Sequence, residues 1–196
     1  MNGVNNSMWS MFSSADFDTS DVELPSARKH NREGQARHLD ESELAEIFQL
    51  LPSEKWQCIF AIAYFTGSRI SEVLKLNVDD VEGDRIVFRK ANTKTRSHRA
   101  VIIVPQLQKF LAAYDAPQSG YMFPSRHNAK QPGHIGRRAA DNVLREVCEA
   151  LELDGTSTHS FRRSFATNLH KRGRKLAEIQ RLLGHKSINM TARYVG

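Results

Sequence analysis

Cysteine is scarce in this 196-residue sequence, and long apolar runs are missing from it. The two cysteines, Cys58 and Cys148, sit among apolar residues in segments of helical periodicity. This predicts buried thiols in a reducing compartment rather than a disulfide. No apolar run approaches the length of a membrane span, and the N-terminus lacks the basic-then-apolar pattern of a secretion signal. We therefore expect a cytoplasmic protein.

Clusters of metal-ligating residues are also missing. Neither cysteine has a second cysteine or a histidine at the spacing of a zinc site. Six of the eight histidines belong to no motif, and we interpret them as surface residues: His30, His38, His98, His127, His134 and His170. We therefore expect no metal and no cofactor.

Acidic residues are few in two stretches of a chain whose net charge is +6. After Asp84, six basic residues follow without an acid between them: Arg85, Arg89, Lys90, Lys94, Arg96 and Arg99. From Thr158 onward, nine lysines and arginines accompany a single acid, Glu178. This uneven distribution predicts a polyanionic partner.

Residues 1–36 differ in composition from the rest of the chain. They are rich in Asn, Ser and Asp and show no sustained apolar periodicity. This predicts a flexible N-terminal segment or a remnant of a linker. Residues 37–196 are expected to form one domain, because the chain is 40% hydrophobic and 26% charged.

Helical patterns dominate this domain. Asp40 with Glu43 marks one helix start, Ser53 marks a second, and Pro105 marks a third. The helix that follows Ser53 is apolar on most faces, which predicts that it lies at the centre of the domain.

Two stretches, 85–89 and 100–104, are rich in β-branched residues and predict strands. The polar stretch between them would connect the two strands of a hairpin. The predicted fold class is α+β, mostly α-helical, with one small antiparallel β-sheet.

The final stretch, 157–196, concentrates the polar residues that suit chemistry on a phosphate. It contains His159 and Arg162 in an H-x-x-R pattern, His185 in LLGHKS, and Tyr194 nine residues after that histidine. Apolar residues recur in it at helical spacing, so it is expected to be folded. Arginine and histidine side chains donate hydrogen bonds to phosphate oxygens, and a tyrosine can act as a nucleophile.

These motifs together resemble the catalytic domain of the tyrosine recombinases, the phage integrase family. The resemblance adds Arg69 in TGSRISE and extends from Arg37 to Val195. It implies metal-independent cleavage of DNA, in which a tyrosine forms a 3′-phosphotyrosyl bond and frees a 5′-hydroxyl. The residues that match the family's catalytic pattern are Arg69, Lys94, His159, Arg162, His185 and Tyr194.

The resemblance also implies a role for each residue. Arg69 and Arg162 would bind the non-bridging oxygens, with His159 and His185 as further phosphate-side groups. Lys94, on the hairpin, would protonate the leaving oxygen, and Glu72 would support the site without reacting. For Lys94, a solvated basic loop is the competing interpretation, because other basic residues lie nearby. Further basic residues are expected at the DNA backbone: Arg96, Arg99, Arg163, Lys171, Arg172 and Lys186.

The expected partner is double-stranded DNA, with a homo-tetramer on paired sites, a monomer in isolation, and association with the nucleoid. Two features depart from the family pattern. Residues 1–36 are too few for the usual clamp domain, and only Val195 and Gly196 follow Tyr194. We therefore expect the segment 190–196 to be mobile without DNA, and Tyr194 to lie away from the arginines.

Two other functions remain open from the sequence. One is a DNA-binding relative of a recombinase that occupies a site without cutting it. The other is a type IB topoisomerase-like activity, which shares the chemistry but needs no tetramer.

Lys94 provides a first test. If Lys94 protonates the leaving oxygen, Lys94→Ala should slow cleavage of normal DNA by about 100-fold or more. In a DNA substrate with sulfur at the 5′-bridging position, the leaving group needs no proton. Lys94→Ala should therefore regain cleavage on this substrate. Cleavage rates on the two substrates measure the effect, and equal losses on both would assign the role to another residue.

Overall fold

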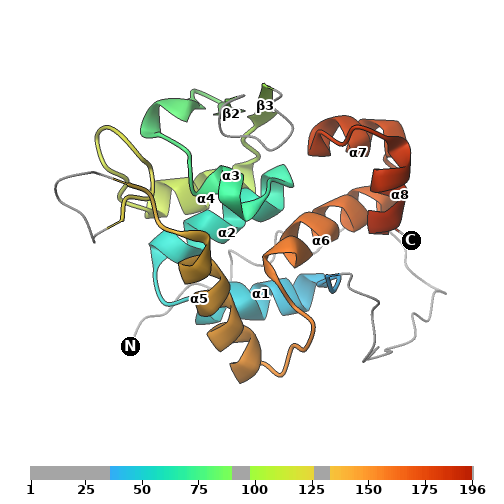
Figure 1. The fold of residues 1–196 in the computed structure, drawn as a ribbon, viewed down its shortest axis with the longest axis horizontal. Helices are drawn as coiled ribbons and strands as arrows, with labels where there is room; N and C mark the ends of the chain where they lie inside the picture. Colours follow the sequence, from blue (N-terminus) through green and yellow to red (C-terminus); the bar gives the residue numbers. More distant parts are fainter. Residues whose placement is uncertain (1–35, 90–97, 126–132, 196) are drawn as a thin grey trace.

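The computed structural model describes residues 36–89, 98–125 and 133–195. Its helices and strands follow one another as shown in Figure 1. In chain order they are α1 (Glu41–Leu50), α2 (Glu54–Thr66), α3 (Ile70–Val73), the 3₁₀ turn η2 (Val78–Asp80), β1 (Val81–Glu82), β2 (Arg85–Phe88), β3 (Arg99–Ile102), α4 (Pro105–Ala113), α5 (Arg137–Ala150), α6 (Thr158–Lys171), α7 (Leu176–Leu183) and α8 (Ile188–Val195). The predicted fold class, mostly helical with a small antiparallel sheet, is confirmed.

The first helix begins as its sequence predicts. The Asp40 carboxylate accepts a hydrogen bond from the Glu43 backbone N–H at 2.9 Å, and the Glu43 carboxylate accepts one from the Asp40 N–H at 3.0 Å. This capping box pairs two backbone donors that the helix itself leaves free. Ser53 is the N-cap of α2 as predicted, but its side chain makes no capping hydrogen bond.

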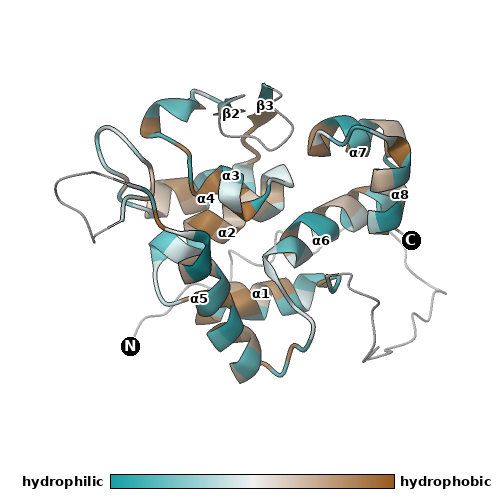
Figure 2. Cartoon of the chain, viewed as in Figure 1, coloured by the Kyte–Doolittle hydropathy of each residue, from teal (hydrophilic) through white to brown (hydrophobic). Residues whose placement is uncertain are grey.

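The second helix is the centre of the domain, as predicted. Its residues from Cys58 to Tyr64 are all buried, and it packs against α3, α4 and α6. Figure 2 shows the apolar colouring of α2 between its neighbours. Phe60 stacks on Phe161 of α6 with ring centroids 5.0 Å apart. Burial of such a ring contributes about 2 to 3 kcal/mol, so α2 and α6 are joined mainly by apolar contact.

Both cysteines are buried, as predicted, and both are free. Burial raises the pKa of the Cys58 thiol to about 12 and that of Cys148 to about 11. Neither thiol is therefore a nucleophile at neutral pH. None of the helices in the described part of the chain is both long and apolar enough to cross a membrane.

The sheet has the order β1-β2-β3, with antiparallel pairs throughout. Ile86 faces Val101, and Phe88 faces Arg99. The two predicted strands are confirmed within one or two residues at each end. The third strand, β1, was not predicted, because two residues are too few to show an alternation. The stretch 90–97 between β2 and β3 lies outside the described residues.

A smaller apolar cluster lies at the C-terminal end. Ile179 and Leu183 of α7 and Ala166 of α6 form its buried centre, and Tyr194 and Val195 of α8 pack against them. Figure 1 shows α7 and α8 at one end of α6, away from α5. The Thr167 hydroxyl donates to the Tyr194 carbonyl at 2.8 Å. The helix that carries the tyrosine is therefore attached to α6 by both packing and a hydrogen bond.

Gly67 lies where the end of α2 meets α6 and α7. It ends α2 with φ of +60°, in the left-handed region that favours glycine. A Cβ atom at this position would lie 2.5 Å from Phe165 Cδ1 and 2.8 Å from Leu183 Cδ2. A side chain here would therefore push α6 and α7 away from the end of α2.

Gly67→Ala should lower the free energy of unfolding by about 3 kcal/mol, since backbone strain and overpacking add. Gly83→Ala is the matched control, because Gly83 has φ of +59° and nothing within 4 Å of the added Cβ. It should cost about 1 kcal/mol. Denaturant unfolding measures both variants, and equal losses would show that the approach of Phe165 and Leu183 has no energetic weight.

Candidate active site

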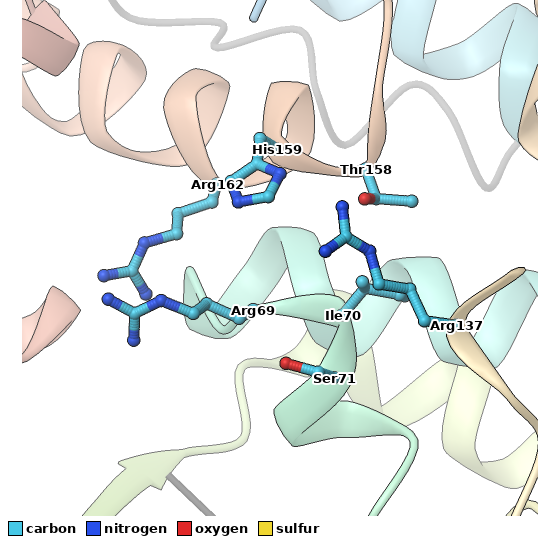
Figure 3. Close-up of a pocket in the computed structure, with 7 residues that line it drawn as sticks. All are labelled: Arg69, Ile70, Ser71, Arg137, Thr158, His159 and Arg162. Atoms are coloured by element: carbon cyan, nitrogen blue, oxygen red, sulfur yellow. The ribbon is translucent and has the colours of Figure 1, made fainter. Parts of the chain in front are cut away.

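A pocket between α3, α5 and α6 brings together three of the predicted catalytic residues. It is lined by Arg69, Ile70, Ser71, Arg137, Thr158, His159 and Arg162, and has a volume of about 120 Å³. Figure 3 shows the guanidinium groups of Arg69 and Arg162 close together, with the His159 ring beside them. Arg137 reaches toward His159 from the other side. Three guanidinium groups and an imidazole around one hollow are a set of side chains that can bind an anion.

Arg162 is the most deeply buried charge of this site, with 1% of its surface exposed. Its Nη1 donates to the Gly67 carbonyl at 2.6 Å, and its Nη2 donates to the Leu183 carbonyl at 2.8 Å. Both acceptors are backbone oxygens at helix ends, so the guanidinium is fixed in place. Its Nε–H is buried without a partner among the described residues.

Burial and the charge of Arg69 lower the pKa of Arg162 to about 10, which leaves it protonated at neutral pH. A buried cation with an unsatisfied N–H is costly for a protein. An incoming anion would offset this cost. The structure thus holds Arg162 ready for a negatively charged ligand.

Arg69 stands two residues after Gly67 and is the N-cap of α3. The Glu72 carboxylate accepts a hydrogen bond from Arg69 Nη1 at 2.9 Å and another from the Arg69 backbone N–H at 3.0 Å. Glu72 is itself only 3% exposed. A buried carboxylate that binds both the backbone and the side chain of one arginine restricts the position of its guanidinium.

Arg99 differs from the expectation of a DNA-backbone contact. Its guanidinium points into the protein, where it donates to the Ser68 hydroxyl and the Leu182 carbonyl and lies 3.9 Å from the Glu72 carboxylate. It also lies 4.8 Å from the centre of the Phe88 ring. Arg99 of β3 is paired with Phe88 of β2, and its guanidinium lies near the end of α2. Through its bond to the Leu182 carbonyl, Arg99 links β3 to α7.

His185 lies just after the end of α7 and is 6% exposed. Its Nδ1 is 3.1 Å from the Thr191 hydroxyl, and its ring centroid is 5.1 Å from that of Tyr194. Burial, followed by the charges of Arg162, Arg69 and Arg99, lowers the pKa of His185 to about 4. The imidazole is therefore uncharged at neutral pH.

Tyr194 is half-buried on α8 and lies against His185. Its phenolate charge would raise the pKa of Arg162, which places the two side chains within electrostatic reach of each other. This differs from the expectation that Tyr194 lies away from the arginines. The contacts of α8 with α6 and α7 account for the difference, because they fix the tyrosine beside the site.

His159 stands at the rim of the pocket and is exposed. Partial burial, followed by the charges of Arg137, Arg162 and Arg69, lowers its pKa. The neutral form, which can accept or donate a proton at the pocket, is therefore favoured.

The other predicted residues do not line the pocket or lie outside the described part of the chain. Lys94 and Arg96 are outside the described residues. Arg163 donates to the Ala36 carbonyl at 2.9 Å, so its guanidinium contacts the start of the domain. Lys171, Arg172 and Lys186 are exposed, and Arg172 pairs with Glu41 at 3.1 Å.

Three residues of the site were not predicted from the sequence. Arg137 begins α5 and pairs through its Nε with Asp141 at 3.2 Å. Thr158 donates to the same carboxylate at 3.1 Å. Thr191 contacts His185. Arg137 and Thr158 belong to no motif, whereas Thr191 stands three residues before Tyr194, a spacing that places both on one helix face.

Fold and site together define a mostly helical domain in which Arg69, Arg162 and His159 line one pocket. His185 and Tyr194 pack against each other within electrostatic reach of Arg162. Such a set can bind a phosphodiester and offer an oxygen nucleophile to it. Within the described residues, no three His, Cys, Asp or Glu side chains gather where they could hold a metal ion. Residues 37–196 match the model of the phage integrase family. The chain belongs to this family, which confirms the resemblance.

Two relatives differ in how much of their own length this chain covers. The probable integrase/recombinase YoeC of Bacillus subtilis (strain 168) is 29% identical over 162 residues, which cover 82% of this chain and 87% of that protein. Tyrosine recombinase XerC of Bradyrhizobium diazoefficiens is 35% identical over 152 residues, which cover 70% of this chain and 44% of that protein. The chain thus spans most of YoeC but less than half of XerC.

Solved structures show the same fold. XerA recombinase superposes with a TM-score of 0.70 at 22% identity, over 81% of this chain and 60% of that one. XerH bound to its difH substrate gives 0.65 at 21% identity, over 81% of this chain and 50% of that one. The catalytic domain of bacteriophage HP1 integrase gives 0.61 at 24% identity, over 82% of this chain and 87% of that one.

The low pKa of His185 predicts a pH dependence of stability. The folded pKa is about 4 and the ordinary value is 6.5, so between these values the unfolded chain binds more protons. The His185 contribution to the free energy of unfolding is therefore fully present above pH 6.5 and falls by about 3 kcal/mol toward pH 4.

His185→Gln should flatten the loss of stability on acidification, as measured by denaturant unfolding at a series of pH values. His170→Gln, at an exposed position on α6, is the control and should leave the curve of the original protein unchanged. Parallel curves for all three proteins would show that His185 does not titrate with a depressed pKa.

Proposed function

We propose that this chain breaks and rejoins DNA strands as the catalytic domain of a site-specific recombinase. The observation that supports this most is that the guanidinium groups of Arg69 and Arg162 line one pocket and that Arg162 is within electrostatic reach of Tyr194. A phosphodiester is an anion that these two cations would bind, with its phosphorus presented to a tyrosine. The DNA complex of XerH, a protein of the same fold, supports DNA as the partner.

In the proposed reaction, Arg69 and Arg162 bind the non-bridging oxygens of the phosphate. Their planar guanidinium groups come from two different elements, so they can meet the oxygens from two sides. Charge on these oxygens is stabilised by donors that are already in place, which lowers the barrier to phosphoryl transfer. Glu72 holds Arg69 in position, and the contacts at 2.9 and 3.0 Å support this role.

Tyr194 attacks the phosphorus, and the bond to the 5′-oxygen breaks as the bond to the tyrosine oxygen forms. The product is a 3′-phosphotyrosyl link and a free 5′-hydroxyl. The tyrosine proton passes to His159, whose neutral form can accept it, and Lys94 supplies the proton that the leaving oxygen needs. The bond energy is kept in the covalent link, so a second 5′-hydroxyl can rejoin the strand by the reverse reaction.

Exposed cations around the site would bind the DNA backbone. We assign this role to Lys171, Arg172 and Lys186, and also to Arg137, whose guanidinium faces the pocket from the side opposite to Arg69. Arg96 belongs to the same group. Such contacts contribute affinity and salt dependence more than sequence choice.

The assembly is also part of the proposal. Residues 37–196 act as the catalytic domain, and the protein is a monomer alone that forms a homo-tetramer on two paired DNA sites. It would work in the cytoplasm, on the DNA of the nucleoid.

Covalent capture tests the proposed function. A nicked duplex from the neighbourhood of the gene loses the strand end after cleavage, so a covalent protein–DNA adduct should accumulate and survive denaturing electrophoresis. Tyr194→Phe should bring the adduct below detection, because the nucleophile is lost. Tyr121→Phe is the matched control, since Tyr121 lies beside His134 in the loop after α4.

The adduct should therefore form with the original protein and with Tyr121→Phe, and not with Tyr194→Phe. Intact binding in a gel-shift assay without any adduct, across nicked duplexes that cover the gene's neighbourhood, would show a non-cleaving DNA-binding protein instead.

A further inference from the structure

The surroundings of His185 contain more than the predicted catalytic residues. Its backbone is held to α7 in two places: its N–H donates to the Gln180 carbonyl at 3.1 Å, and its carbonyl accepts from Gln180 Nε2 at 3.0 Å. Its ring meets α8 in two places, at the Thr191 hydroxyl and the Tyr194 ring. The imidazole therefore lies between the helix that precedes it and the helix that carries the nucleophile.

Thr191 is completely buried, at 0% exposure, although its side chain is polar. A buried hydroxyl and a buried imidazole nitrogen each need a hydrogen-bond partner. The 3.1 Å contact between Thr191 Oγ1 and His185 Nδ1 is the side-chain contact that the described residues provide for both. If the hydroxyl donates to Nδ1, both groups are satisfied at once.

The direction of this hydrogen bond decides which nitrogen of His185 carries the proton. A neutral imidazole has one N–H and one acceptor nitrogen. When Nδ1 accepts from Thr191, the proton is on Nε2, which is then a hydrogen-bond donor. A donor at this position is what a phosphate needs, because its oxygens only accept.

We infer that Thr191 is a positioning residue that holds His185 in the Nε2–H tautomer, and that His185 is a phosphate donor only while α8 is docked. The second part rests on the proposed function, whereas the tautomer does not. Thr191 and Tyr194 are three residues apart on α8, so one docking event brings both to His185. The docking of α8 therefore brings the nucleophile, Tyr194, to the site and orients the donor, His185, at the same time.

The attachment of α8 supports this coupling. The helix packs on α6 and α7, and the Tyr194 carbonyl accepts from the Thr167 hydroxyl at 2.8 Å. When α8 leaves this position, the buried Nδ1 loses its donor and the tautomer is no longer fixed. A site without its tyrosine would then also lack its oriented histidine.

Two variants of Thr191 separate the hydroxyl from the shape of the side chain. Thr191→Val keeps the shape and removes the hydroxyl, whereas Thr191→Ser keeps the hydroxyl and removes a methyl group. Long-range ¹H–¹⁵N NMR correlations on protein labelled in histidine report the tautomer of His185 without DNA. His159, which lies on α6, is an internal control in the same spectra.

The original protein and Thr191→Ser should show the Nε2–H tautomer, and Thr191→Val should show a mixture or the Nδ1–H form. In the covalent-capture assay, Thr191→Val should slow adduct formation about tenfold, the effect of one lost hydrogen bond in the site, and Thr191→Ser should largely restore the rate.

An Nδ1–H tautomer in the original protein would overturn the inference by itself, even if Thr191→Val fails to fold. A Thr191→Val protein with unchanged tautomer and rate would overturn it too. If the tautomer follows the hydroxyl but no protein forms an adduct, the positioning role stands and the proposed function fails. If adducts form at equal rates while the tautomer changes, the proposed function stands and the coupling fails.

Discussion

The position of one guanidinium determines much of this structure. Arg162 extends from α6 and binds the backbone carbonyls of Gly67 and Leu183, which belong to the ends of α2 and α7. These bonds require that Gly67 has no side chain, since a Cβ atom there would collide with Phe165 and Leu183. The left-handed turn at Gly67 also places Arg69 at the start of α3. One buried cation thus specifies how three helices approach each other and where its neighbour in the pocket stands.

The site concentrates positive charge without a matching number of acids. Arg69, Arg99 and Arg162 all act on His185, and together with burial they keep its imidazole neutral. Glu72 is the acid that faces both Arg69 and Arg99, and it is almost completely buried. Such an arrangement is unfavourable for the free protein and favourable for a complex with an anion, because the desolvation has already taken place. The electrostatics of the site therefore favour binding and reaction at the expense of stability.

The sequence predicted the parts of the site that depend on short spacings. The H-x-x-R pattern places His159 and Arg162 one helical turn apart. Outside the site, Asp40 and Glu43 form the capping box that the D-x-x-E spacing indicates. Arg99 was predicted to contact the DNA backbone, because it belongs to a run of positive charges on the hairpin. The pairing of β3 with β2 and the depth of Ser68 and Glu72 direct it inward, and neither is visible in a local pattern.

The residues that were missed are those whose role depends on how the helices pack. Arg137 reaches the pocket because α5 packs against α6, the next helix, and against α3, which is remote from it in sequence. Thr191 acquires its contact only after the chain turns at Gly184 and α8 folds back on α7. Short patterns indicate which residue types are available, whereas the packing of helices decides which of them meet.

The two apolar clusters of the fold lie on either side of the site. The larger one surrounds α2, and the smaller one joins α6, α7 and α8. Arg162 and Arg99 cross this boundary, since both donate to carbonyls near the end of α7, at Leu183 and Leu182. A local opening of the smaller cluster would separate these carbonyls from the arginines and let water reach the charges. The C-terminal helices therefore cover the buried guanidinium of Arg162 and also support Tyr194, so one part of the fold both shields a charge from water and carries the proposed nucleophile.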